Sequence, residues 1–216
     1  MTPQQFVSQL RDLQFVNAFN PYSDRCSVYD LEDAPQRRSE LLEKILEIAV
    51  RTEVDAFWVG RDLGFRGGRR TGMALTDDVH FQAHLSRWGI VREKPTSGLP
   101  ITERTATIIW EMLEWIDDPI FLWNVYPLHP HSPDSPFTNR AHNAKERKAG
   151  TEILDQLIQL LRPKRLIAVG NDAEKVLGQI SGTVPVLKVR HPSYGGQTEF
   201  SRQVRELYGI KQGTLL

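Results

Sequence analysis

Cysteine and long apolar runs are almost absent from this sequence. Cys26 is the only cysteine among 216 residues, which excludes an intramolecular disulfide, a cysteine-ligated iron-sulfur cluster and a cysteine-rich zinc site. No stretch approaches the roughly 20 apolar residues that a membrane helix needs, and the N-terminus lacks a charged-then-apolar signal pattern. We therefore expect a cytoplasmic protein that does not contact a membrane.

A net charge is also lacking. Lys and Arg together number 27, as do Asp and Glu, which argues against a histone-like protein or one that coats polyanions in general. Any contact with DNA must then come from a local patch. One glycine-rich segment holds four arginines within ten residues, a composition suited to cradling backbone phosphates: Arg61, Arg66, Arg69 and Arg70.

No linker rich in low-complexity sequence interrupts the chain. The polar stretches at 93–100 and 130–148 have the length of loops within one fold. With 40% hydrophobic residues, the chain is long enough to bury one substantial core. We expect a single domain over residues 1–216, in which residues 1–50 form a helical extension packed on the core.

What the sequence does contain is an alternation of short apolar runs with amphipathic segments. Near-continuous apolarity predicts strands covered on both faces at 55–60, 120–124, 165–170 and 185–189. Helical spacing of apolar side chains predicts helices at 39–50, 78–88, 102–116, 144–161 and 172–180. Ser39, Thr102 and Asn171 are expected N-caps, and Pro163 should end the fourth helix. The alternation predicts an α/β protein with three α/β/α layers and a mostly parallel four-stranded sheet.

In such a sheet, ligands gather at the carboxyl ends of the strands, so the residues after each predicted strand are the first candidates for a binding site. The first strand runs into Gly60-Arg61-Asp62-Leu63-Gly64, and the second ends at Asn124. The last strand is followed by His191-Pro192-Ser193. Thr71-Gly72-Met73-Ala74-Leu75 lies downstream of the first loop, and the pair Asn139-Arg140 precedes the long helix predicted at 144–161.

This ordered set resembles the uracil-DNA glycosylase superfamily over roughly residues 55–196, as a divergent member without an iron-sulfur cluster. The resemblance implies a monomer that cleaves the N-glycosidic bond of a base flipped out of DNA. It places water activation and stabilisation of the cationic sugar on Asp62, and a hydrogen bond to the base oxygen on His191. Asn124 is then expected to read the Watson-Crick edge of the base. Neither catalytic role needs a metal or another cofactor.

The resemblance breaks at the base platform. The family pattern has a phenylalanine close to Leu75, which cannot stack with equal area. Phe65 or Phe81 is a possible substitute, or the pocket is wide enough for a modified cytosine or another enlarged pyrimidine. The expected base-binding set is therefore Gly60, Phe65, Leu75 and Asn124.

Several other residues are expected to contact single- or double-stranded DNA. Tyr194 and the following Gly195 can form a wedge that enters the duplex beside Ser193, and Arg140 can contact the backbone. His129 and His131 lie two residues apart in a proline-rich loop, where solvated or phosphate-facing positions are expected rather than metal ligation.

Each assignment has a structural alternative. Asp62 beside glycine is also typical of an Asx turn, His191 of a turn fixed by proline, and Asn124 of a strand end that bonds its own backbone. Two other functions also fit: a nucleotide-binding α/β enzyme with a phosphate in the 60–68 loop, and a non-catalytic lesion-binding protein of the same fold. The first lacks both a GxGxxG and a Walker lysine pattern. The sequence leaves open which base is excised, and whether the setting is repair or defence against modified foreign DNA.

Overall fold

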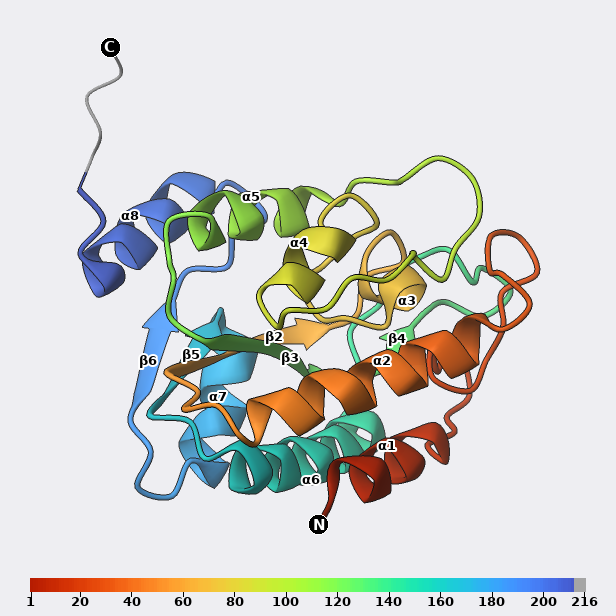
Figure 1. Ribbon diagram of the computed structural model, residues 1–216, viewed down its shortest axis with the longest axis horizontal. Coiled ribbons are helices and arrows are strands. Elements are labelled where there is room, and N and C mark those ends of the chain that lie inside the picture. The colour runs from red at the N-terminus through yellow and green to blue at the C-terminus, as the bar shows by residue number, and fades with distance from the viewer. Residues whose placement is uncertain (212–216) are drawn as a thin grey trace.

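Four parallel strands form the centre of the structure, a computed structural model that describes residues 1–211 (Figure 1). The strands lie in the order β3-β2-β5-β6, and each pairs with its neighbours in parallel. Their bounds are Ala56–Asp62 (β2), Ile120–Tyr126 (β3), Arg165–Val169 (β5) and Val186–Val189 (β6). The predicted α/β fold with a parallel four-stranded sheet is confirmed. Residues 212–216 of the predicted domain lie outside the described residues.

Helices cover both faces of this sheet, and two short strands pair away from it. The helices are α1 (Pro3–Arg11), α2 (Ala34–Ala49), α3 (Gly68–Thr71), α4 (Phe81–Ser86), α5 (Arg104–Leu113), α6 (Ala144–Leu161), α7 (Asn171–Ile180) and α8 (Gln197–Tyr208). The short strands β1 (Ala18–Phe19) and β4 (His129–Pro130) pair antiparallel. The sequence did not predict this small second sheet.

Alternate side chains of each strand enter two separate apolar cores. From β2, Phe57 and Val59 join the core that α1, α2, α6 and α7 cover. Ala56 and Trp58 point the opposite way, into the core under α5 and α8. Figure 1 shows these two groups of helices on opposite sides of the sheet. Burial on both faces explains why β2, β3 and β5 are apolar at nearly every position, whereas Leu187 and Lys188 of β6 are exposed.

The element boundaries differ from the predicted ones where backbone bonding overrides the apolar pattern. Strand β2 continues to Asp62, which pairs with Tyr126 of β3, so Asp62 ends a strand instead of lying in a loop. Helix α2 begins at Ala34 with proline in its first turn. Ser39 therefore lies inside the helix, where its hydroxyl donates to the carbonyl of Tyr22 at 3.0 Å.

The other two predicted caps are also corrected. Thr102 precedes the N-cap of α5, which is Glu103, and Asn171 is the first residue of α7, with Gly170 as N-cap. Helix α1 lies in the predicted helical extension over residues 1–50, for which no separate bounds were given. Helix α8 was not predicted because it buries only a narrow stripe, Phe200 and Val204. The predicted 78–88 helix shrinks to the six residues of α4.

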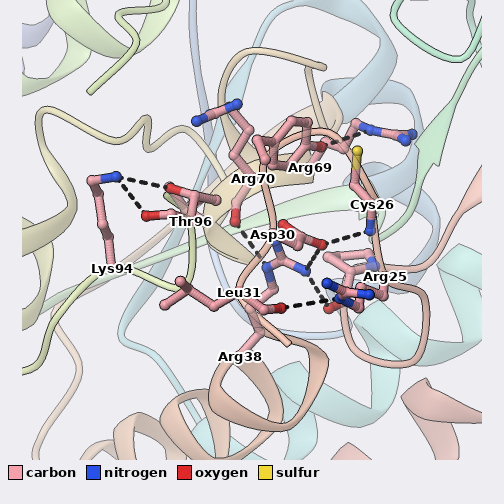
Figure 2. Close-up of polar contacts among 12 residues, drawn as sticks. Arg25, Cys26, Asp30, Leu31, Arg38, Arg69, Arg70, Lys94 and Thr96 are labelled. Carbon is pink, nitrogen blue, oxygen red and sulfur yellow. Dashed lines mark hydrogen bonds and ion pairs between the residues drawn. The ribbon is translucent and has the colours of Figure 1, made fainter. Parts of the chain in front are cut away.

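The N-terminal region braces the glycine-rich segment that follows β2. Figure 2 shows Arg38, on α2, reaching Asp30 and the backbone at Arg70. Its Nε donates to the Arg70 carbonyl at 2.8 Å, and the Tyr22 hydroxyl donates to the Gly72 carbonyl at 2.6 Å. Gly72 has φ +73°, and a Cβ there would lie 3.0 Å from the Arg38 stem, so glycine is required. The extension is thus tied to the segment that leads to the strand-end residues.

Candidate active site

A cleft of about 560 Å³ opens at the carboxyl ends of the strands. Asp62, Leu75, His191 and Tyr194 line it together with Glu103, which the sequence did not single out. These residues come from the end of β2, the segment after α3, the segment after β6 and the start of α5. The parallel sheet therefore brings together residues separated by up to 132 positions in the chain.

Asp62 is held on both oxygens of its carboxylate. Nδ1 of His142 contacts Oδ1, and the Arg61 Nε donates to Oδ2 at 2.7 Å. The Asp62 side chain is only 7% exposed. Sequence reasoning missed His142, because it lies 80 residues from Asp62. The one local signal is its position directly before Asn143, the N-cap of α6.

His191 is a neutral imidazole with one nitrogen free to donate. The Ser193 backbone N–H donates to its Nδ1 at 3.1 Å, so the ring proton resides on Nε2. Burial lowers the pKa of His191 to about 4, and the nearby guanidinium groups of Arg61 and Arg190 act in the same direction. His191 therefore stays uncharged at neutral pH and can donate a hydrogen bond without carrying a positive charge.

Asn124 carries a buried amide with no partner. The residue is 1% exposed, and neither Oδ1 nor Nδ2 has a hydrogen bond within the described part of the protein. It lies against Gly60, where a Cβ would come within 2.4 Å of the Asn124 Oδ1 and 2.9 Å of the Leu75 side chain. An unpaired buried amide costs about 1–3 kcal/mol of stability. The Asn124 amide is therefore either available to hydrogen-bond a ligand or a net cost to the fold.

Leu75 lines the cleft, whereas Asn124 and Gly60 lie behind that lining. Leu75 has φ +55°, a conformation that leucine rarely adopts. Its carbonyl accepts a hydrogen bond from the Trp110 Nε1 at 3.1 Å, which helps to hold the backbone there. Asn124 itself is therefore not exposed to the cleft in this structure.

The two phenylalanines considered as base platforms take other positions. Phe81 is 3% exposed and belongs to the core under α1 and α2, so its assignment to the pocket is wrong. Phe65 is half-buried and lies outside the cleft lining. Its backbone N–H donates to the Asn139 Oδ1 at 3.0 Å. Tyr194 is the aromatic residue that does line the cleft.

The Glu103 carboxyl group lies against the glycine-rich segment at the edge of the cleft. A Cβ at Gly64 would lie 2.2 Å from its Oε1, and one at Gly67 would lie 2.0 Å from its Oε2. A side chain at either glycine would force the Glu103 carboxyl group to move. Burial, with the negative charge of Asp77 nearby, raises the pKa of Glu103 to about 7.

Two of the four clustered arginines are structural. Arg69 is buried, with its Nε donating to the Tyr29 hydroxyl at 2.8 Å and its guanidinium 3.8 Å from the centre of the Phe19 ring. Arg70 pairs with Asp78 at 2.7 Å. Both residues are only 4% exposed, which corrects their interpretation as phosphate contacts. Figure 2 shows them packed against the N-terminal segment.

Arg140 is also engaged by the protein. Its guanidinium bonds both oxygens of the buried Glu146, at 2.6 and 2.7 Å, and donates to the carbonyls of Asn17 and His131. Few of its donors face the cleft that it helps to line. Arg140 thus connects α6 to the segments that flank β1 and β4. This corrects the expectation that its guanidinium contacts the DNA backbone.

The remaining predicted DNA-binding residues are accessible. Arg61 and Arg66 are exposed. Tyr194 is fully exposed, with φ +53°, and Gly195 follows at φ +77° in open space. The Ser193 hydroxyl lies 3.1 Å from that of Thr105, which ties this segment to α5. The segment thus presents an aromatic ring outward from a tight turn beside His191.

His129 is not solvated as expected. It is buried, and its Nδ1 lies 3.0 Å from the Arg69 guanidinium. Its ring also stacks on that of His131. Across residues 1–211, no group of three or more His, Cys, Asp or Glu side chains is placed to hold a metal ion. The helices in that range are all too short or too polar to cross a lipid bilayer.

The fold and the cleft together define an α/β protein with a carboxylate and a neutral imidazole at the strand ends. Residues 54–208 match the family model of the uracil DNA glycosylase superfamily, and the chain belongs to this superfamily. The structure resembles the crystal structure of wild-type SMUG2 from Pedobacter heparinus with a TM-score of 0.62 and 15% sequence identity. That match covers 99% of this chain and 100% of the other. No curated protein sequence matches the chain.

Proposed function

We propose that this protein is a DNA glycosylase that hydrolyses the N-glycosidic bond of a flipped-out uracil or modified pyrimidine and leaves an abasic site. The observation that carries the proposal is the convergence of the Asp62 carboxylate and the neutral His191 imidazole on one cleft. Membership of a superfamily that consists mostly of DNA glycosylases supports a DNA substrate.

In the proposed reaction, the two groups act on opposite sides of the bond that breaks. Asp62 accepts a proton from water as the water oxygen bonds to C1′ of the sugar, and its charge stabilises the cationic sugar. The bond between C1′ and the base breaks, and its electron pair leaves with the base. His191 donates a hydrogen bond from Nε2 to the base oxygen where negative charge develops. The base then takes up a proton from solvent.

Asn124 is the proposed reader of the base. Its amide offers one acceptor and two donors, which match the alternating N–H and C=O groups on the edge of a pyrimidine. The buried amide has no hydrogen-bond partner among residues 1–211, which supports the assignment. Leu75, in place of an aromatic platform, supports a pocket that tolerates a substituent on the base.

The proposed DNA surface consists of the accessible residues at the rim of the cleft. Arg66 supplies positive charge for the phosphates, together with the exposed part of Arg61, whose guanidinium also pairs with Asp62 and Asp172. Tyr194 is the proposed wedge that fills the space left by the flipped base, with Ser193 and Gly195 allowing close approach of the backbone. A phosphate in the 60–68 loop is disfavoured, because the Glu103 carboxyl already occupies the hollow formed by Gly64 and Gly67.

The test is cleavage of labelled single- and double-stranded oligonucleotides that carry uracil, hypoxanthine or a 5-substituted pyrimidine, followed by alkali. We expect strand breaks with the wild type that are lost in Asp62→Asn and His191→Ala. Asp117→Asn, an exposed carboxylate outside the cleft, is the matched control and should cleave normally. Tight binding without breaks would favour the lesion-binding alternative, and breaks that survive both site variants would overturn the assignment of residues.

A further inference from the structure

His142 connects the proposed catalytic carboxylate to the first turn of α6. Its side chain is 1% exposed, and its Nδ1 contacts Oδ1 of Asp62. On the other side of the ring, Nε2 lies 3.1 Å from Nε of Arg147. The Tyr126 ring packs beside the imidazole, with centroids 6.0 Å apart. Arg147, His142 and Asp62 therefore form a chain of contacts that ends in the cleft.

The chemistry of arginine fixes where the imidazole proton lies. A guanidinium nitrogen is always protonated and can only donate. Nε2 of His142 must accept the hydrogen bond from Arg147, so the ring proton is on Nδ1 and points at the carboxylate. Each end of the imidazole thus has one partner of the right kind, and the ring has no other orientation that satisfies both.

We propose that His142 is a positioning residue that holds Asp62 in its reactive orientation, with its tautomer set by Arg147. This inference rests on the proposed glycosylase function. A free aspartate side chain rotates about two bonds, whereas Asp62 is fixed at Oδ1 by His142 and at Oδ2 by Arg61. The remaining lone pairs of the carboxylate then have a defined direction in which a water can be held, and a small misplacement of such a group costs about 100-fold in rate.

The first experiment compares two substitutions that differ in one donor. His142→Asn keeps an N–H close to the place of Nδ1, and His142→Leu removes it. We expect His142→Leu to lower kcat by about 100-fold with little change in KM, and His142→Asn to recover most of that loss. His131→Leu, a half-buried histidine outside the cleft, is the control. Equal loss in the Asn and Leu variants would overturn the donor role.

A double-mutant cycle separates positioning from general damage to the fold. In an Asp62→Asn background, His142→Leu should lower the residual rate little further, because the group that it positions is already disabled. A full additional loss of about 100-fold would mean that His142 acts independently of Asp62 and would overturn the proposal. Thermal melts of all variants show whether they fold.

A spectroscopic readout tests the tautomer without relying on activity. Long-range ¹H–¹⁵N spectra of the wild type should show His142 protonated at Nδ1 only, and Arg147→Met should release that preference. Protonation at Nε2 alone would contradict the contact chain. If the wild type cleaves no substrate but the tautomer is as expected, the proposed function and the positioning role both fail while the contact chain stands. If the wild type cleaves and His142→Leu is fully active, only the positioning role fails.

Discussion

The backbone N–H of Ser193 donates a 3.1 Å hydrogen bond to Nδ1 of His191 and thereby assigns the ring proton to Nε2. Since the pKa of His191 is lowered to about 4, its protonation state does not change between about pH 6 and 8. We expect the single-turnover cleavage rate to show no titration of this residue over that range, and His191→Ala to lose about 100-fold or more. A transition near the ordinary histidine pKa of about 6.5 that disappears in His191→Ala would contradict the neutral imidazole.

The unpaired Asn124 amide should lower the stability of the fold while serving base recognition. Leucine has nearly the shape of asparagine but no polar atoms, so Asn124→Leu removes two unpaired buried groups. We expect the free energy of unfolding in urea to rise by about 1 kcal/mol while kcat/KM for base cleavage falls. A variant that is less stable and fully active would show that the amide serves the fold instead.

The exposed ring of Tyr194 should matter for duplex DNA in particular. A wedge repays the cost of unstacking a paired base, a cost that is smaller in single strands. We expect Tyr194→Ala to reduce kcat/KM on duplex substrates about tenfold, to leave single-stranded substrates nearly unaffected and to leave stability unchanged. Leu99→Ala, another exposed apolar residue outside the cleft, is the control. Equal losses on both substrate forms would argue against a wedge.

Much of the fold could be predicted because β2, β3 and β5 are buried on both faces. Short continuous apolar runs such as the one ending at Asn124 are typical of central parallel strands, and the order of strand-end motifs then placed Asp62 and His191 at one edge. The same pattern could not give α8, in which only Phe200 and Val204 are buried.

Side-chain partners across long sequence distances were the part that the sequence could not supply. Arg70 looks like a phosphate ligand beside three other arginines, yet it is buried against Asp78. His142 is a single histidine in a polar loop, and it contacts Asp62 only because the fold places the start of α6 beside the end of β2. Pairing of this kind depends on the fold and leaves no local pattern.

Glu103 should make stability fall as pH rises. The pKa of Glu103 is about 7 in the folded protein against an ordinary value of 4.5, so the folded state binds the proton more tightly. The contribution is therefore fully present below pH 4.5 and lost as pH rises through about 7. The glutamine in Glu103→Gln cannot ionise. Between about pH 5 and pH 8, the free energy of unfolding of this variant should therefore rise relative to that of the wild type, by at most about 3 kcal/mol.

Urea unfolding at both pH values measures this difference in unfolding free energy between Glu103→Gln and the wild type. Glu111→Gln, an exposed carboxyl on the same helix, is the matched control and should show no such trend. An identical difference between Glu103→Gln and the wild type at both pH values would mean that the group is already ionised at the lower one.

The buried pair of Arg38 and Asp30 should be costly to break. Arg38→Met removes the cation paired with the buried Asp30 carboxylate, which keeps only the Cys26 N–H, and the donor to the Arg70 carbonyl. We expect a loss of about 3–5 kcal/mol in unfolding free energy. Arg37→Met breaks a neighbouring exposed pair with Asp33 and should have little effect. Similar small losses in both variants would show that the buried pair is not a major support.

The match to the family model begins at residue 54, but the segment that carries Leu75 into the cleft is not self-supporting. Its carbonyls at Arg70 and Gly72 are bonded by Arg38 and Tyr22, which precede that boundary. A fragment cut to the shared family region would leave both carbonyls without these donors. Residues outside the matched region therefore support the cleft without lining it, because Arg38 and Tyr22 hold the backbone that leads to Leu75.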